Sequence, residues 1–135
     1  MNNTSDYRSY GWWVEPDPKT DNTTLIVGGR VSALRMPAEI AARVHQVLSI
    51  HLQTGPVLDA GDHWVLFTQS DGRRDRPDDL AEVAVVPAGS RLVLPPLDDP
   101  RWINPPRADR SVPERQVIFS ATRRARTDTM PLVAA

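Results

Sequence analysis

The chain has 135 residues, of which 40% are hydrophobic, 6% aromatic and 24% charged, and its formal net charge is -1. This length suits one domain, and the absence of cysteine excludes a disulfide framework, a thiolate zinc site and a cysteine nucleophile. No window approaches the roughly 18 consecutive apolar residues of a membrane helix, and the N-terminus lacks the basic start and apolar run of a signal peptide. We therefore expect a cytoplasmic protein without a membrane partner.

The N-terminal segment divides into a polar part and an aromatic part. Residues 1–10 are polar, and we expect them to be flexible and to precede a single α+β domain over residues 11–121. The Trp12-Trp13 pair is expected to lie in an edge strand or in a cover over the core, because large rings gain the most from burial. Pro16 and Pro18 then stop regular strand pairing.

The next stretch predicts a hairpin followed by a helix. Two apolar runs, 24–27 and 31–36, flank Gly28-Gly29, where either glycine can adopt positive φ. A helix is expected over 37–53, because Pro37 suits the first helical turn and an apolar residue recurs at the spacing of one helical face. The residues of this face are Ile40, Val44, Val47, Leu48 and Leu52.

The central stretch, residues 54–106, predicts the core of the fold. Short runs rich in Val, Leu, Ile and Trp are separated by Gly, Pro and Asp clusters, as in a small antiparallel sheet with tight connections. Strands are expected at 56–58, 63–68, 83–86, 91–94 and 102–103, and the first two are expected to pair as a hairpin. The predicted fold class is therefore α+β, a mainly antiparallel sheet of about five to seven strands with the principal helix, 37–53, packed on one face.

The C-terminal part carries an excess of arginine. Residues 116–121 predict either an edge strand or the start of a helix, and residues 122–135 predict a flexible basic tail. Arg123, Arg124 and Arg126 could neutralise the phosphates of a nucleic acid. The alternative is a solvated tail without a ligand, and this arm offers no aromatic residue except Phe119 for stacking on bases.

A few side chains are candidates for metal binding or chemistry. Glu15 and Asp17 form a carboxylate pair that could hold a divalent metal ion, although Asp beside Pro is also favoured for turn hydrogen bonds. His63 opens an apolar run after Gly61-Asp62, where its side chain could reach a shallow site or finish a turn. The sequence contains neither a phosphate-binding glycine loop nor a GxSxG nucleophile motif.

Three segments resemble the N-terminal domain of bifunctional DNA primase/polymerases, the prim-pol family of actinobacterial and plasmid proteins. The segment Gly61–Phe67 is similar to the family's glycine-rich turn and histidine before a strand, and Gly89–Pro96 is similar to its glycine-containing strand that ends in Pro-Pro. The segment Arg101–Ile103 is similar to its aromatic strand, and Glu15–Pro18 faintly resembles its acidic metal motif. The resemblance implies that His63 contacts a nucleotide.

The chain departs from this family where a later metal-binding acid is required. Ala84, Val85 and Val86 stand before the glycine-containing strand, and without a full set of carboxylates two metal ions cannot be held for nucleotidyl transfer. The resemblance therefore implies a catalytically degenerate relative in DNA replication.

Three functions follow as hypotheses. The first is a non-catalytic binding domain that binds nucleic acid or a partner protein. The second is a metal-dependent nucleotidyltransferase, in which Glu15, Asp17 and His63 must converge; a divalent metal is expected only in this case. The third is a small interaction or regulatory module, with a homodimer as one form of assembly and the Trp-Trp segment or the helix face as its interface.

Overall fold

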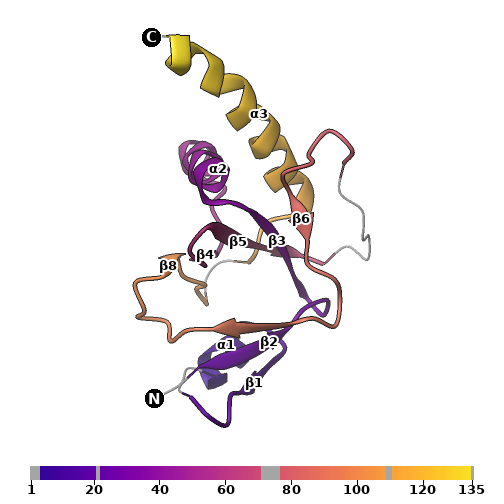
Figure 1. Cartoon of the computed structure of the whole chain (residues 1–135). Coiled ribbons are helices and arrows are strands. Elements are labelled where there is room, and N and C mark those ends of the chain that lie inside the picture. Colours follow the sequence, from indigo (N-terminus) through magenta and orange to yellow (C-terminus); the bar gives the residue numbers. More distant parts are fainter. Residues whose placement is uncertain (1–3, 21, 71–76, 109–110, 135) are drawn as a thin grey trace.

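The computed structural model describes residues 4–20, 22–70, 77–108 and 111–134, with side chains as far as residue 126. The fold is α+β, as predicted, with two antiparallel sheets and three helices (Figure 1). The three-stranded sheet has the order β1-β2-β7 and the five-stranded sheet has the order β6-β3-β5-β4-β8. No helix in the described part of the chain is long and apolar enough to cross a membrane.

The elements follow one another along the chain as α1 (Thr4–Ser9), β1 (Val14–Pro16), β2 (Thr23–Ile26), β3 (Val31–Pro37), α2 (Ala38–Ile50), β4 (Val57–Asp59), β5 (His63–Gln69), β6 (Ala84–Val85), β7 (Arg91–Leu94), β8 (Trp102–Asn104) and α3 (Arg115–Ala134).

The five-stranded sheet forms the middle layer. Along β3 and β5, alternate side chains point to opposite faces of the sheet, and both faces are buried. Val31, Ala33 and Phe67 join one apolar cluster, whereas Leu34 and Leu66 join another. The three-stranded sheet and α1 cover the first face, and α2 and α3 cover the second (Figure 1).

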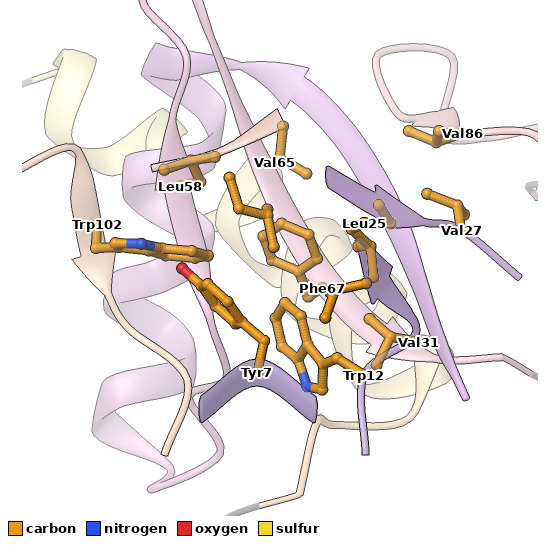
Figure 2. Packing of buried hydrophobic residues seen from close by; sticks show 13 residues of the cluster. Tyr7, Trp12, Leu25, Val27, Val31, Leu58, Val65, Phe67, Val86 and Trp102 are labelled. Atoms are coloured by element: carbon orange, nitrogen blue, oxygen red, sulfur yellow. The ribbon is translucent and has the colours of Figure 1, made fainter. Parts of the chain in front are cut away.

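Four aromatic rings form a closed set between the two sheets (Figure 2). The ring centroids of Tyr7 and Trp12 are 5.7 Å apart, those of Trp12 and Phe67 are 5.2 Å apart, and those of Phe67 and Trp102 are 5.7 Å apart. Trp102 closes the set at 6.4 Å from Tyr7. The Tyr7 hydroxyl donates a hydrogen bond of 2.8 Å to the carbonyl of Pro95, so this ring is fixed at both ends.

The second cluster is mainly aliphatic and lies under the helices. Helix α2 buries Ala41, Val44 and Leu48, and Ile40 and Val47 are partly buried against the same cluster, so the predicted helix and four of the five residues of its predicted apolar face are confirmed. Helix α3 contributes Ile118, Phe119, Ala121 and Ala125. Gly55 lies directly against the ring of Pro113, where a Cβ atom would clash, and this close approach brings the end of α2 beside the start of α3.

The predicted hairpin around Gly28-Gly29 is wrong. Strand β2 pairs with β1 and β7, whereas β3 pairs with β5 and β6 in the other sheet. The physical reason is that the chain turns a corner at Gly28 and passes from one sheet to the other. The amide of Gly28 donates to the carbonyl of Val31, and Gly28 has a φ of 106°. A Cβ atom on Gly28 would lie 2.7 Å from the Cβ atom of Ala88, which belongs to the connection between β6 and β7. The two connections therefore pack too closely for a side chain at Gly28.

The predicted strands of the central stretch are present. The hairpin of β4 and β5 is confirmed, since Val57 pairs with Leu66 and Asp59 with Trp64. Strands β6, β7 and β8 fall within one or two residues of the expected runs.

Both terminal segments differ from the expectation of flexibility. Residues 4–9 form α1, and Tyr7 is wholly buried because its ring completes the aromatic set. The expected tail, 122–135, is helical as far as Ala134, where α3 ends, and Thr122 and Ala125 are buried on the helix side of the sheet. The folded domain therefore extends beyond the predicted limits of 11 and 121. Residues 1–3 and 135 lie outside the described residues.

Candidate binding surfaces

His63 is the first residue of β5 and forms a local contact. Its Nδ1 lies 2.8 Å from Oδ1 of Asp62, the preceding residue, and this hydrogen bond holds the pKa of the Asp62 carboxyl below its usual value. Asp62 is almost fully exposed. The geometry matches a histidine that finishes a turn, the alternative recognised from the sequence.

Glu15 and Asp17 are also engaged locally. The Glu15 carboxylate lies 2.9 Å from Nη1 of Arg91 across the three-stranded sheet. Asp17 accepts hydrogen bonds from the amide of Lys19 and the hydroxyl of Thr20, and these bonds lower its pKa. Glu15 therefore forms an ion pair, and Asp17 accepts the hydrogen bonds of a turn.

The convergence required by the nucleotidyltransferase hypothesis is not found. Glu15 and Asp17 belong to β1 and its following turn, whereas His63 belongs to the other sheet. Among the residues whose side chains are described, no group of three His, Asp or Glu residues is placed to hold a metal ion. The structure thus contradicts the geometry on which the Glu15, Asp17 and His63 site depends.

The three C-terminal arginines lie on α3 and not on a tail. Nε of Arg123 lies 2.8 Å from Oδ2 of Asp79, and a second bond joins Nη2 to Oδ1, a bidentate pair that lowers the pKa of Asp79. Arg126 donates to the main-chain carbonyl of Asp79 and lies 3.5 Å from Glu82. Arg124 lines the groove between α2 and α3. Two of the three cations thus serve to dock α3 on the segment before β6.

A different surface carries an exposed tryptophan, and we call it the Trp13 face. It is the outer face of the three-stranded sheet, and its residues are Trp13, Glu15, Thr24, Ile26, Arg91 and Val93, with Arg8 beside β1 and Arg30 beside Gly11. Trp13 is 57% exposed and Val93 is 55% exposed.

The strand register explains why one tryptophan is buried and the next is not. Successive side chains of a strand point to opposite faces, so Trp12 enters the aromatic set while Trp13 faces outward. The amide of Ile26 donates to the carbonyl of Trp13, and Ile26 pairs in turn with Arg91, which places these three residues in one row across the sheet. The Trp13 ring also lies beside Gly29 at the corner.

Arginines line the edge of the Trp13 face. Nη2 of Arg8 lies 3.5 Å from the carbonyl of Val14, and the Arg30 side chain runs alongside Gly11. Arg91 is bound to Glu15, and Arg8 and Arg30 are two further cations at the margin of the face. Exposed tryptophan and arginine together are the residue types most enriched at binding hot spots.

The second surface is a groove between α2 and α3. It has a volume of about 420 Å³ and is open to solvent, and its walls include Val47 and His51 of the α2 end together with Val117 and Arg124 of α3. None of the lining residues whose side chains are described is an aspartate or a glutamate. The two helices that form it lie at the opposite end of the molecule from the three-stranded sheet (Figure 1).

The end of α2, beside this groove, holds two exposed apolar side chains. Ile50 is 70% exposed and Leu52 is 88% exposed. Leu52 has a φ of 55°, in the left-handed region that glycine usually occupies after a helix. This conformation costs about 1–2 kcal/mol for a residue with a side chain. The prediction that Leu52 belongs to the buried face of the helix is therefore wrong, because α2 ends before it.

The sequence offered a signal for one of these surfaces. In WWVEP, strand alternation implies that only one tryptophan can face the core, although the sequence does not say which. The groove depends on how α3 packs on α2, and no local pattern predicts that packing.

Comparisons with protein-family models, with curated proteins and with solved structures find no match to this chain.

Proposed function

We propose that this protein is a non-catalytic binding module that holds a partner protein against the Trp13 face. The observation that carries the proposal is the exposure of Trp13, a large ring on the outer face of the three-stranded sheet, which also carries the exposed Val93 on its other edge strand. Large exposed apolar side chains that gather on one face mark interaction surfaces in soluble proteins.

The composition of the Trp13 face supports a protein ligand. Its apolar residues are Trp13, Ile26 and Val93, of which Ile26 is only 8% exposed, and its margin carries Arg8, Arg30 and the Arg91–Glu15 pair. An apolar centre within a polar rim is the usual anatomy of a protein interface. The buried aromatic set lies directly beneath and fixes the strand that presents Trp13, so little order has to be gained on binding.

The same residues indicate the chemistry of the partner. A segment with an aliphatic or aromatic side chain would cover Trp13 and Val93, and acidic residues flanking it would meet Arg8 and Arg30. Charged groups at an interface margin mainly set specificity and association rate. We therefore expect a partner segment with an apolar centre and acidic flanks.

The experiment is selection from a displayed peptide library against the purified full chain, followed by affinity measurement for the enriched peptides. Trp13→Ser should weaken their binding by about tenfold or more, as loss of a hot-spot tryptophan does. Ile103→Ser, which changes another exposed apolar strand residue, is the matched control and should bind like the wild type. Enriched peptides that bind both variants equally would overturn the Trp13 face as the site.

A second candidate is single-stranded nucleic acid, the ligand class implied by the resemblance to prim-pol domains. Trp13 could stack on a base, and Arg8 and Arg30 could contact phosphates, the combination used by proteins that bind single strands. Labelled single-stranded oligonucleotides, titrated at low and moderate salt, test this directly. Binding that falls with salt and is lost in both Trp13→Ser and Arg30→Glu would favour this candidate over the protein partner.

A further inference from the structure

We infer that the free edge of strand β7 accepts an extended segment of the partner protein, which joins the three-stranded sheet as a fourth strand. The inference deepens the proposed function and rests on it, because it names the form in which the partner lies against the Trp13 face. It is carried by the hydrogen bonds that β7 makes and by those that it leaves unmade.

The register of the three-stranded sheet determines which main-chain groups of β7 lie at its free edge. Ser90, just before β7, accepts a hydrogen bond from the chain just after β2. In an antiparallel pair, only alternate residues bond to the neighbouring strand, so Leu92 and Leu94 turn their amides and carbonyls toward β2. The amides and carbonyls of the two residues between them in this alternation, Arg91 and Val93, point away from β2.

These outward groups have no strand beside them. Among the strands that the structure describes, β7 pairs with β2 alone and forms one edge of its sheet. No main-chain hydrogen bond joins Arg91 or Val93 to any other described part of the chain. Both side chains are exposed, so this part of β7 lies at the surface. An unpaired strand edge of this kind is a template for a strand from another chain.

The opposite edge of the same sheet is closed. The outward positions of β1 are Val14 and Pro16, because the residues on either side of them bond to β2 and the turn after it. The Val14 carbonyl accepts a hydrogen bond of 3.5 Å from Nη2 of Arg8, and Pro16 has no N–H group. Proteins protect sheet edges with proline and with local contacts of this kind.

The edges of the five-stranded sheet are also poor templates. Strand β6 has only two residues, and the pairing of β8 with β4 is interrupted by a register shift. A register shift bends a strand and disrupts its pairing. Among the sheet edges that the structure describes, β7 therefore offers the most regular one to an incoming strand.

The length of β7 favours a short extended segment as the occupant. The strand has four residues and is followed by Pro95, whose carbonyl is already bonded to Tyr7. A segment of about four or five residues spans this length, and it needs only to reach the edge. A second copy of the chain would have to bring a whole folded domain to a strand of the same four residues.

Strand addition also places the side chains of the partner segment. Successive side chains of the added strand would point to opposite faces. One set would lie beside Val93 and extend the Trp13 face, and the other would lie beside Leu92, which is partly buried against the cluster that contains the aromatic rings. We therefore expect apolar, β-branched or aromatic residues on both sides of the segment. In recognition of this kind, main-chain hydrogen bonds supply affinity and alternate side chains supply specificity.

The first test uses the full chain and the peptides enriched from the displayed library. Each peptide is synthesised with a single N-methyl group at successive residues, which removes one amide donor at a time. Methylation at every second residue of the bound stretch should weaken binding by about tenfold or more, and methylation of the residues between should not. Affinities without this alternation would overturn the inference.

Amide hydrogen exchange of the full chain provides a control within β7 itself. The amides of Arg91 and Val93 should exchange rapidly in the free protein and slowly with peptide bound, whereas those of Leu92 and Leu94 should be protected in both states. Val93→Pro, which removes one outward N–H group, should lose peptide binding. Its melting temperature should stay within a few degrees of the wild type, because proline is tolerated at edge positions.

The outcomes separate this inference from the proposed function. Peptides that depend on Trp13 without protecting the Arg91 and Val93 amides would overturn strand addition and leave the Trp13 face as the site. Peptides that protect both amides but bind Trp13→Ser equally well would support strand addition and overturn the Trp13 face. Protection that appears at high protein concentration without peptide would identify a second copy as the added strand, against the inference. A library that yields no binding peptide would overturn both.

Discussion

The two faces of the five-stranded sheet bury their side chains by different means. Toward the three-stranded sheet, four aromatic rings from distant parts of the chain contact one another, and the hydrogen bond from Tyr7 to Pro95 spans 88 residues. Toward the helices, aliphatic residues of α2 and α3 cover the sheet. One face thus depends on the meeting of remote segments, and the other on the regular apolar stripes of two helices.

This difference decides what each face contributes to the candidate surfaces. The aromatic face anchors the N-terminal segment through Trp12, and the next residue, Trp13, faces solvent. The helix face leaves the groove between α2 and α3. A substitution that disturbs the packing of one face should therefore disturb the surface on that side of the sheet more than the surface on the other side.

The largest effect is expected for Tyr7→Ala. Removal of a wholly buried aromatic ring should lower the free energy of unfolding by about 3–5 kcal/mol, since the Tyr7 ring contacts those of Trp12 and Trp102. Urea unfolding followed by tryptophan fluorescence measures this. Ser5→Ala, on the exposed side of the same helix, should change it by less than about 0.5 kcal/mol. A small effect of Tyr7→Ala would show that α1 is dispensable and would break the comparison.

Leu48→Ala tests the helix face and should follow in size. The substitution leaves a cavity under α2 and should cost about 3 kcal/mol, because Leu48 is buried among residues of α2, α3 and the sheet. Urea unfolding again gives the value, with the exposed Gln46→Ala as control. The near-ultraviolet circular dichroism contributed by Trp12 and Trp102 should be altered in Tyr7→Ala, whereas in Leu48→Ala only the contribution of Trp64, which packs beside the helices, should change. The opposite pattern would mean that the two faces are not separate units of packing.

The sequence predicted the helix face better than the aromatic face, for a physical reason. Helix α2 and the β4–β5 hairpin depend on periodicity and turn residues within short windows, which can be recognised locally. The burial of Tyr7 depends on rings that are remote in the sequence, so residues 1–10 looked merely polar. The corner at Gly28 was misread as a hairpin because Gly28-Gly29 suits a hairpin turn and a corner between two sheets equally well. The two are distinguished only by the remote partners of the flanking strands, since β2 pairs with β7 and β3 pairs with β6.

The candidate sites follow the same pattern. The sequence showed Arg123, Arg124 and Arg126 as a cationic group, but Asp79, the partner of Arg123 and Arg126, lies more than forty residues earlier, beyond any local signal. His63 was expected at the start of a strand, where the structure places it. The turn and ion-pair contacts of His63, Glu15 and Asp17 are those that such residues commonly make. The strained Leu52 could not be predicted, because its conformation depends on where α2 ends.

Tyr7→Phe should have a moderate effect and a diagnostic pH dependence. Loss of the hydrogen bond to Pro95 should cost about 1 kcal/mol at neutral pH. Burial raises the pKa of Tyr7 far above the value of about 10 that it has in an unfolded chain. The unfolded state therefore releases its proton first, and the wild type should lose stability as the pH rises above about 10. Unfolding midpoints against pH should fall less steeply for Tyr7→Phe; equal slopes would exclude Tyr7 as the source.

His45→Gln should have a smaller effect, confined to acid pH. Burial lowers the pKa of the His45 ring, which packs edge-on to Trp64 beside α2. The unfolded chain takes up a proton near the usual pKa of about 6.5, while the folded chain resists it, so stability is present above this pH and is lost as the pH falls toward the lowered value. The variant should flatten this part of the stability profile. His51→Gln, at the end of the same helix, is the control and should leave it unchanged.

Asp79→Asn should give the smallest effect and shows what holds α3 in place. The hydrogen bonds from Arg123 lower the pKa of Asp79, so the pair stabilises the fold above the usual carboxyl pKa of about 3.9, and this contribution is lost as the pH falls through the lowered value. Both side chains are exposed, and salt should weaken the pair further. Thermal melts at low and high salt, with Asp78→Asn as control, should show a slight destabilisation that salt removes. Because Ile118 and Phe119 remain buried, α3 should stay docked; release of the helix in Asp79→Asn would mean that ion pairs, and not the apolar stripe, secure this face.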